Sequence, residues 1–161
     1  GGAMAFKILF VCLGNICRSP TAHAVMVKKA AALTLPEPFE VESAGTSASH
    51  RGELPDPRSV RVGMNFGYPF DGIVSRPVKE SDFNYYDLIL AMDADNLQAL
   101  KKRCPVPLQY KLKLFMQFHP QYPSLQEVPD PYYGGSRGFE VVFSLIEQGC
   151  DGLISHLLRE T

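Results

Sequence analysis

Residues 12–20, with the sequence Cys-Leu-Gly-Asn-Ile-Cys-Arg-Ser-Pro, constrain the fold of this chain more than any other segment. They lie between an apolar run at residues 6–11 and a helix-forming stretch at residues 21–33. An apolar run of this length is typical of a buried parallel strand. The segment therefore predicts a tight strand-to-helix loop, whose backbone N–H groups and helix N-terminus point into one small volume and attract an anion.

The residue types of this loop suit an oxyanion held next to a reactive thiol. Arg18 offers a planar, charged fork that matches phosphate oxygens. Gly14 lets the backbone approach a ligand closely, and Asn15 tolerates a positive φ. Cys12 is expected at the base, where the field that binds phosphate also favours its thiolate. The expected phosphate cradle consists of Leu13, Gly14, Asn15, Ile16, Cys17 and Arg18.

Two further residues support a helix that begins directly after the loop. Ser19 can either cap the helix or form a hydrogen bond with the sulfur of Cys12. Pro20 fits the first helical turn, where its missing N–H does no harm. The alternative is a plain strand–turn–helix junction whose buried cysteine only packs, which the combination of these residues makes much less favourable.

Five segments together resemble the low-molecular-weight protein tyrosine phosphatase family. They are residues 12–20, 41–46 (Val-Glu-Ser-Ala-Gly-Thr), 55–58 (Pro-Asp-Pro-Arg), 87–93 (Asp-Leu-Ile-Leu-Ala-Met-Asp) and 128–134 (Val-Pro-Asp-Pro-Tyr-Tyr-Gly). The resemblance extends from about Phe6 to Leu158. It implies hydrolysis of protein phosphotyrosine and aryl phosphates through a cysteinyl-phosphate intermediate on Cys12. Because Arg18 and the loop amides already supply a positive field, we expect no metal and no other cofactor.

Length and composition fit a single domain. The chain has 161 residues, of which 45% are hydrophobic and 20% charged, with a formal net charge of -1. We therefore expect a single domain over residues 4–161, and interpret Gly1, Gly2 and Ala3 before Met4 as a remnant of an expression vector. The balanced charge gives no reason to expect a nucleic-acid partner. No apolar stretch of about 18 residues indicates a membrane span, and no signal-peptide pattern is present.

The cysteines and histidines indicate a reducing compartment and no metal site. A chain of this size and hydrophobicity does not need disulfides, so we expect a cytoplasmic protein. The four cysteines are Cys12, Cys17, Cys104 and Cys150. The histidines are scattered and lack the spacing of zinc ligands.

Apolar runs alternate with helix-period segments along the rest of the chain. This alternation predicts an α/β fold, with a single three-layer domain, a four-stranded parallel sheet and helices on both faces. Ligands of such sheets bind at the carboxyl ends of the strands. Beyond the first strand and helix, we expect strands at residues 39–43, 88–92 and 111–116, helices at 56–65, 93–103 and 139–158, an irregular segment at 74–83 and a long loop at 117–136.

The long loop carries the best candidate for a general acid. Asp130 is flanked by Pro129 and Pro131, which stiffen the chain around it. The resemblance gives this aspartate the role of protonating the leaving group, whereas the alternative is a simple turn aspartate. The second Asp-Pro pair begins at Asp56 and precedes a helix pattern, so Asp56 is interpreted as a helix N-cap. Asp93 and Asp95 are also interpreted as caps.

The walls of the pocket are expected to be apolar and aromatic, so that they enclose a phenyl ring. The candidates are Leu13, Ile16, Ser49, Tyr132 and Tyr133. Many members of the resembled family carry an aromatic residue where this chain has Ser49. The resemblance also gives Ser43 the role of steadying Asn15. Members of the eukaryotic type place a histidine near Gly72, so its absence implies that Asn15 is held differently here.

Three other functions compete with the phosphotyrosine assignment. An arsenate reductase on this fold would need two more cysteines close together, but Cys104 and Cys150 are isolated. An arginine phosphatase of the family would carry threonine in place of Ile16. A non-catalytic phosphate-binding module would have lost Cys12 or Asp130, and both are present.

We expect a monomer that acts on phosphotyrosine-containing proteins. Inorganic phosphate and other oxyanions should compete for the same loop. Cys17 lies five residues after Cys12. It is expected either to protect Cys12 from irreversible oxidation through a disulfide, or to fill space behind the loop.

Overall fold

Strands and helices alternate along the chain in the computed structural model, which describes residues 5–35, 38–132 and 134–160. The strands are β1 (Phe6–Cys12), β2 (Phe39–Gly45), β3 (Leu88–Ala91) and β4 (Leu112–Leu114). They form one parallel sheet in the order β2-β1-β3-β4. The four-stranded parallel sheet expected from the sequence is therefore confirmed.

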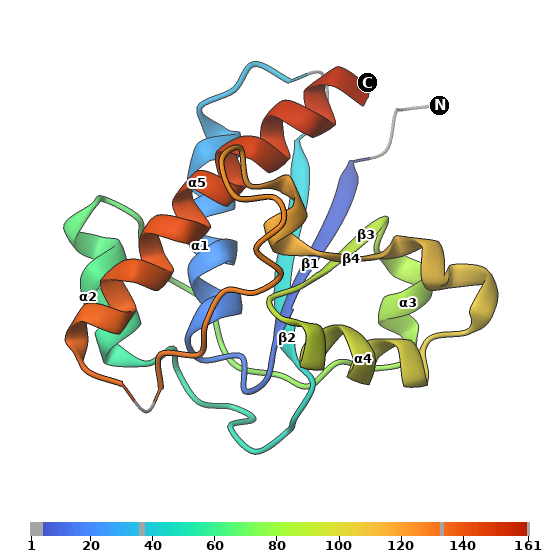
Figure 1. Ribbon diagram of the computed structural model, residues 1–161, viewed down its shortest axis with the longest axis horizontal. Helices are drawn as coiled ribbons and strands as arrows, with labels where there is room; N and C mark the ends of the chain where they lie inside the picture. The colour runs from blue at the N-terminus through green and yellow to red at the C-terminus, as the bar shows by residue number, and fades with distance from the viewer. Residues whose placement is uncertain (1–4, 36–37, 133, 161) are drawn as a thin grey trace.

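Helices cover both faces of this sheet, as the alternating pattern predicts. One face carries α1 (Arg18–Ala31), α2 (Pro57–Asn65) and α5 (Ser136–Glu160), and the other carries α3 (Ser81–Tyr85) and α4 (Ala94–Arg103) (Figure 1). The parallel order brings the carboxyl ends of the strands to one edge. The β1–α1 loop lies at this edge, and so does the start of α4.

The central strand β1 divides the core into two parts because its side chains alternate between the two faces. Ile8 and Phe10 belong to the apolar cluster that packs against α1 and α5. Leu9 and Val11 belong to the cluster on the other face, with residues of α3 and α4. All four side chains are fully buried, and each such burial contributes about 1.5–3 kcal/mol. The strand that carries Cys12 is therefore held rigidly from both sides.

Helix α5 is the one helix in the described ranges that is long and apolar enough to cross a membrane by length and composition alone. Its apolar side is used within the fold. Phe143, Ile146, Cys150 and Leu153 pack into the core beside α1, and all are 3% exposed or less. We therefore describe α5 as a core helix of the α/β fold.

Several boundaries differ from those expected from the sequence. The first helix begins at Arg18 rather than at residue 21, because Ser19 and Pro20 fit into its first turn. The fourth strand is limited to residues 112–114, because 3₁₀ helices at Val106–Lys111 and Phe115–Phe118 occupy its predicted ends.

The short helix α3 overlaps the end of the segment expected to be irregular, residues 74–83. Asp82 in this helix is buried and forms an ion pair with Arg76 at 2.9 Å. Its carboxylate also accepts a hydrogen bond from the backbone N–H of Lys79. These contacts hold a helix of five residues that is too short to give a periodic signal.

Candidate active site

The β1–α1 loop turns sharply at Asn15, whose φ is 56°. Because this left-handed conformation disfavours most side chains, Asn15 fits the expectation that it tolerates a positive φ. Its amide nitrogen donates to Ser19 Oγ at 2.8 Å, and its amide oxygen accepts from the N–H of Arg76 at 3.0 Å. Ser75 Oγ also donates to the carbonyl of Gly14 at 2.9 Å. The loop is therefore braced from outside by residues 75 and 76.

This bracing corrects the role that the resemblance gave to Ser43. The Ser43 hydroxyl lies 3.0 Å from Nδ1 of His23, on α1, and is hydrogen-bonded there. Asn15 is instead held by Ser19 and Arg76. This chain has Gly72 where eukaryotic-type members place a histidine, and Ser19 and Arg76 hold Asn15 without it.

Cys12 lies at the carboxyl end of β1, with 2% of its surface exposed. Its sulfur is 3.0 Å from Ser19 Oγ and accepts a hydrogen bond from the Ser19 N–H at 3.4 Å. Of the two roles expected for Ser19, the structure shows the contact with the sulfur. Cys17 is the N-cap of α1, without a side-chain capping bond among the described residues. Donors aimed at sulfur stabilise a thiolate.

Arg18 is buried, and its guanidinium is fixed by three partners. Nη1 donates to Asp93 Oδ2 at 2.6 Å and to the carbonyl of Val128 at 3.1 Å, and Nη2 lies 3.5 Å from Asp130 Oδ2. Burial on its own would lower the pKa of Arg18, but the nearby charges of Cys12 and the two carboxylates outweigh it and raise that pKa above its ordinary value. Arg18 therefore presents a permanent positive charge in a fixed orientation.

Asp93 has two functions, of which the sequence indicated one. Its side chain caps α4, as expected, by accepting from the N–H of Asn96 at 2.7 Å. The same carboxylate pairs with Arg18, a contact that sequence reasoning missed. Asp95, also expected to cap, lies inside the first turn of α4. Asp56 caps α2 as expected and accepts from the N–H of Arg58 at 2.9 Å.

Asp130 comes from the long loop and reaches the same place as Cys12 and Arg18. The loop is tied to the sheet where the N–H of Val128 donates to the carbonyl of Met92 at 2.8 Å. One carboxylate oxygen of Asp130 faces Arg18, and the other accepts from the N–H of Tyr132 at 3.1 Å. The Asp130 side chain is 36% exposed. It can therefore exchange protons with solvent while it faces the cavity.

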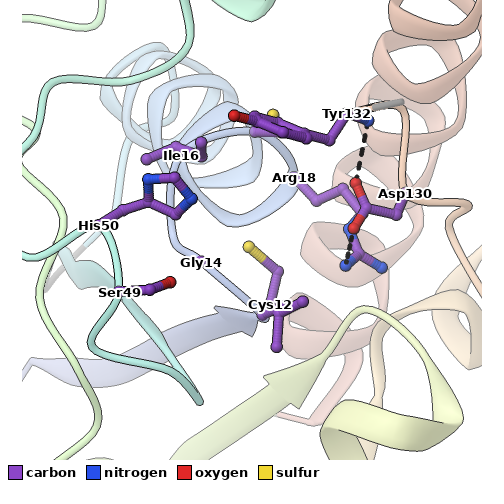
Figure 2. A pocket seen from close by; sticks show the side chains of 10 residues that line it. Cys12, Gly14, Ile16, Arg18, Ser49, His50, Asp130 and Tyr132 are labelled. Atoms are coloured by element: carbon purple, nitrogen blue, oxygen red, sulfur yellow. Dashed lines mark hydrogen bonds and ion pairs between the residues drawn. The ribbon is translucent and has the colours of Figure 1, made fainter. Parts of the chain in front are cut away.

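These residues surround one cavity of about 140 Å³. In Figure 2 the Cys12 sulfur points into the space between His50 and Ser49 on one side and Arg18 and Asp130 on the other, with Tyr132 opposite. The cavity is lined by Cys12, Leu13, Gly14, Ile16, Cys17, Arg18, Ser49, His50, Asp130 and Tyr132. Tyr133, also expected in the walls, lies outside the described residues.

His50 is a wall residue that the sequence analysis missed. Its Nδ1 lies 2.9 Å from Glu53 Oε2, and its ring centroid is 6.0 Å from that of Tyr132. It also explains the glycine at position 14, because a Cβ there would be 2.8 Å from the His50 ring. In the sequence, His50 could have been recognised only from its position next to Ser49, and that position does not show where its ring points.

Comparison with known proteins decides the family. The family described as low molecular weight phosphotyrosine protein phosphatase matches residues 7–161. The chain belongs to this family. It is 41% identical to a putative low molecular weight protein-tyrosine-phosphatase of Synechocystis over 96% of this chain and 98% of that protein. It is 37% identical to the Bacillus subtilis phosphatase YfkJ, over 96% of this chain and 97% of that protein.

Solved structures of phosphatases have the same fold. A protein tyrosine phosphatase from Entamoeba histolytica, with Hepes in its active site, matches with a TM-score of 0.91 and 45% identity, covering 97% of this chain and 99% of that one. The structure of YfkJ matches with a TM-score of 0.92 and 35% identity, covering 100% and 99%. This low molecular weight phosphatase is therefore a hydrolase that acts on phosphomonoesters.

Proposed function

We propose that this phosphatase hydrolyses phosphotyrosine in proteins, and aryl phosphates, through a cysteinyl phosphate formed on Cys12. One observation carries the proposal: a buried thiol, a buried guanidinium and a half-exposed carboxyl group line one small cavity. They are Cys12, Arg18 and Asp130, which combine a nucleophile, a charge that holds phosphate oxygens and an acid. Family membership supports phosphotyrosine hydrolysis as the reaction.

In the first step the Cys12 thiolate attacks phosphorus in line with the ester oxygen. The S–P bond forms as the P–O bond to the tyrosyl group breaks, and Asp130 gives its proton to the departing oxygen. Arg18 and the N–H groups of residues 13–18 hold the three equatorial oxygens. Fixed positive groups of this kind provide most of the stabilisation in phosphoryl transfer.

In the second step water attacks the phosphocysteine. The Asp130 carboxylate accepts the proton of that water, the S–P bond breaks and the electron pair returns to Cys12 as a thiolate. Ser19 supports this step because its hydroxyl and its N–H lie within hydrogen-bonding distance of the sulfur. Inorganic phosphate leaves and, as the product, competes with substrate. No step in this scheme requires a metal ion or another cofactor.

The walls of the cavity support a preference for an aryl substrate. Leu13 and Ile16 offer apolar surface, and Tyr132 and His50 offer rings. A phenyl ring held among such side chains gains about 1–3 kcal/mol from burial and stacking. Ile16 provides no hydroxyl to orient a guanidinium, which favours phosphotyrosine over phosphoarginine.

Replacement of Asp130 tests the proposed acid. In Asp130→Asn we expect kcat/KM for phenyl phosphate to fall by about 10²–10⁴-fold. The loss for 2,4-dinitrophenyl phosphate should be far smaller, because its acidic phenol departs without a proton. The matched control is Glu127→Gln, an exposed acid on the same loop. Equal losses for both esters would show that Asp130 is structural, and activity abolished by a chelator would contradict the metal-free mechanism.

We also propose a redox role for Cys17. Peroxide would oxidise Cys12 to a sulfenic acid, and the Cys17 thiol would displace water from it to form a Cys12–Cys17 disulfide that external thiols reduce. Burial, together with the charge of Asp56, raises the pKa of Cys17 to about 12. A raised pKa keeps Cys17 a thiol, which supports it as the partner that reacts second, and the Cys12 sulfur points into the cavity, which supports it as the one that reacts first.

The setting proposed for this activity is a reducing cytoplasm, with the chain acting as a monomer through one domain over residues 4–161. All four cysteines are buried free thiols in the described ranges, which supports a reducing compartment. The physiological partners would be proteins that carry phosphotyrosine. The family match over residues 7–161 supports one domain.

A further inference from the structure

The proposed acid, Asp130, lies on a long loop, so contacts with the rest of the fold must fix the position of its carboxylate. Asp130 is half-exposed, and its Oδ1 position depends on the N–H of Tyr132. Tyr132 therefore connects the position of Asp130 to whatever packs against the tyrosine ring. A charged side chain outside the cavity packs against this ring.

That side chain is Arg58, in the first turn of α2. Its guanidinium carbon lies 5.5 Å from the centroid of the Tyr132 ring and 4.5 Å from that of Phe139. Both distances fall within the range of cation–π contacts. Arg58 therefore joins Tyr132 on the acid loop to Phe139 near the start of α5.

The orientation of Arg58 is fixed by Asp56 on the same turn. Nε donates to Asp56 Oδ1 at 3.0 Å and Nη2 donates to Oδ2 at 2.8 Å, which is a bidentate pair. The Asp56 N–H in turn donates to the carbonyl of Ile16 at 2.8 Å. Hydrogen bonds through Asp56 therefore connect the Arg58 guanidinium to the backbone of the phosphate loop.

Apolar packing connects the same parts. Ile16, Cys17 and Phe139 form a small buried cluster, and Tyr132 packs against it. The nucleophile loop, the start of α5 and the acid loop therefore meet at one point beside the cavity. Arg58 is the charged group whose contacts join the acid loop to the other two parts.

We propose that Arg58 is a positioning residue for the general acid, which it places by holding Tyr132 against Phe139 and the phosphate loop. The inference rests on the proposed role of Asp130. Loss of the guanidinium would let Tyr132 and its N–H move, so that Asp130 reaches the leaving oxygen less often. Displacement of a catalytic group by about 1 Å can cost up to about 10²-fold in rate.

The predicted signature is a loss that depends on the leaving group. In Arg58→Ala we expect kcat/KM for phenyl phosphate to fall about tenfold, and that for 2,4-dinitrophenyl phosphate to fall less than about threefold. Arg58→Lys keeps the charge but loses the planar fork and the stacking surface, so its loss should be intermediate. The matched control is Arg61→Ala, an exposed arginine on the same helix, which should leave both esters unchanged.

A double-mutant cycle separates positioning from general damage. If Arg58 acts through Asp130, Arg58→Ala should add less than about twofold for phenyl phosphate in an Asp130→Asn background. Inhibition by inorganic phosphate should change less than about threefold in Arg58→Ala, because the phosphate loop remains intact. If the alanine variant does not fold, the same cycle with Arg58→Lys gives the test.

The possible results distinguish the two proposals. Equal losses for both esters in Arg58→Ala, or a full additional loss in the Asp130→Asn background, would overturn the positioning role. If Asp130→Asn itself shows no dependence on the leaving group, the proposed function of Asp130 fails first. If Asp130→Asn shows that dependence and Arg58→Ala does not, only the inference about Arg58 fails.

Discussion

Replacing Ser19 by alanine tests how the phosphate loop serves the second chemical step. Ser19 Oγ is 3.0 Å from the Cys12 sulfur and accepts from the buried amide of Asn15 at 2.8 Å. A hydrogen bond to a charged group contributes about 1.5–3 kcal/mol, and about 1.4 kcal/mol corresponds to a tenfold change in rate. Loss of the donor to the departing thiolate should therefore slow breakdown of the cysteinyl phosphate by roughly 10- to 150-fold.

A second effect of Ser19→Ala should appear in the folded state. The Asn15 amide would lose its acceptor inside the protein, which costs about 1–3 kcal/mol in the free energy of unfolding. Thr21→Val is the matched control for stability. Thr21 is buried two residues further along α1, and its hydroxyl donates to the carbonyl of Cys17 at 2.7 Å rather than to the sulfur.

The assay is rapid mixing with p-nitrophenyl phosphate, combined with urea unfolding of each variant. In Ser19→Ala the burst of p-nitrophenol should remain while the steady rate falls, because the first step does not expel the thiolate. Thr21→Val should lose stability and keep the parent ratio of burst to steady rate. A steady rate of Ser19→Ala within about threefold of the parent would refute this reasoning.

Three further predictions follow from individual residues. Burial lowers the pKa of His23 to about 4, so the unfolded chain gains a proton at a higher pH than the folded chain does. The free energy of unfolding should therefore fall as the pH drops from about 6.5 towards 4. Urea titrations should show a weaker fall in His23→Gln. Peroxide inactivation should be reversed by thiols in the parent and should be largely irreversible in Cys17→Ser. Full recovery of that variant, with no Cys12–Cys17 crosslink in parent peptides, would show that Cys17 only fills space behind the loop. Phosphotyrosine peptides should be hydrolysed in preference to phosphoserine peptides, and Ile16→Thr should shift preference towards phosphoarginine; comparable kcat/KM on phosphoserine peptides would contradict the proposed role of the walls.

Local patterns in the sequence predicted the parts of the fold that depend on neighbours along the chain. The apolar runs gave the parallel sheet, and the turn chemistry of Asn15 and the cap at Asp56 follow from side-chain types. The general acid candidate came from the resemblance of the short segment around Asp130 to the family motif. These features could be recognised because each is contained within a few residues.

The contacts that were missed join residues far apart in the sequence. Arg18 and Asp93 are 75 positions apart, and Asn15 and Arg76 are 61 apart. Neither pair has a periodic signature, and the resemblance led instead to Ser43 as the partner of Asn15. His50 was missed for a similar reason, since only the folded loop turns its ring into the cavity.

The most direct test of the account is to find where phosphate is held during turnover. The parent enzyme is mixed with p-nitrophenyl phosphate, stopped with denaturant during the burst and digested for peptide mass analysis. We expect to find phosphate on Cys12, and we expect a Cys12→Ser variant to bind substrate but to lose essentially all turnover. Phosphate on another residue, or turnover of Cys12→Ser within about tenfold of the parent, would contradict the proposed mechanism.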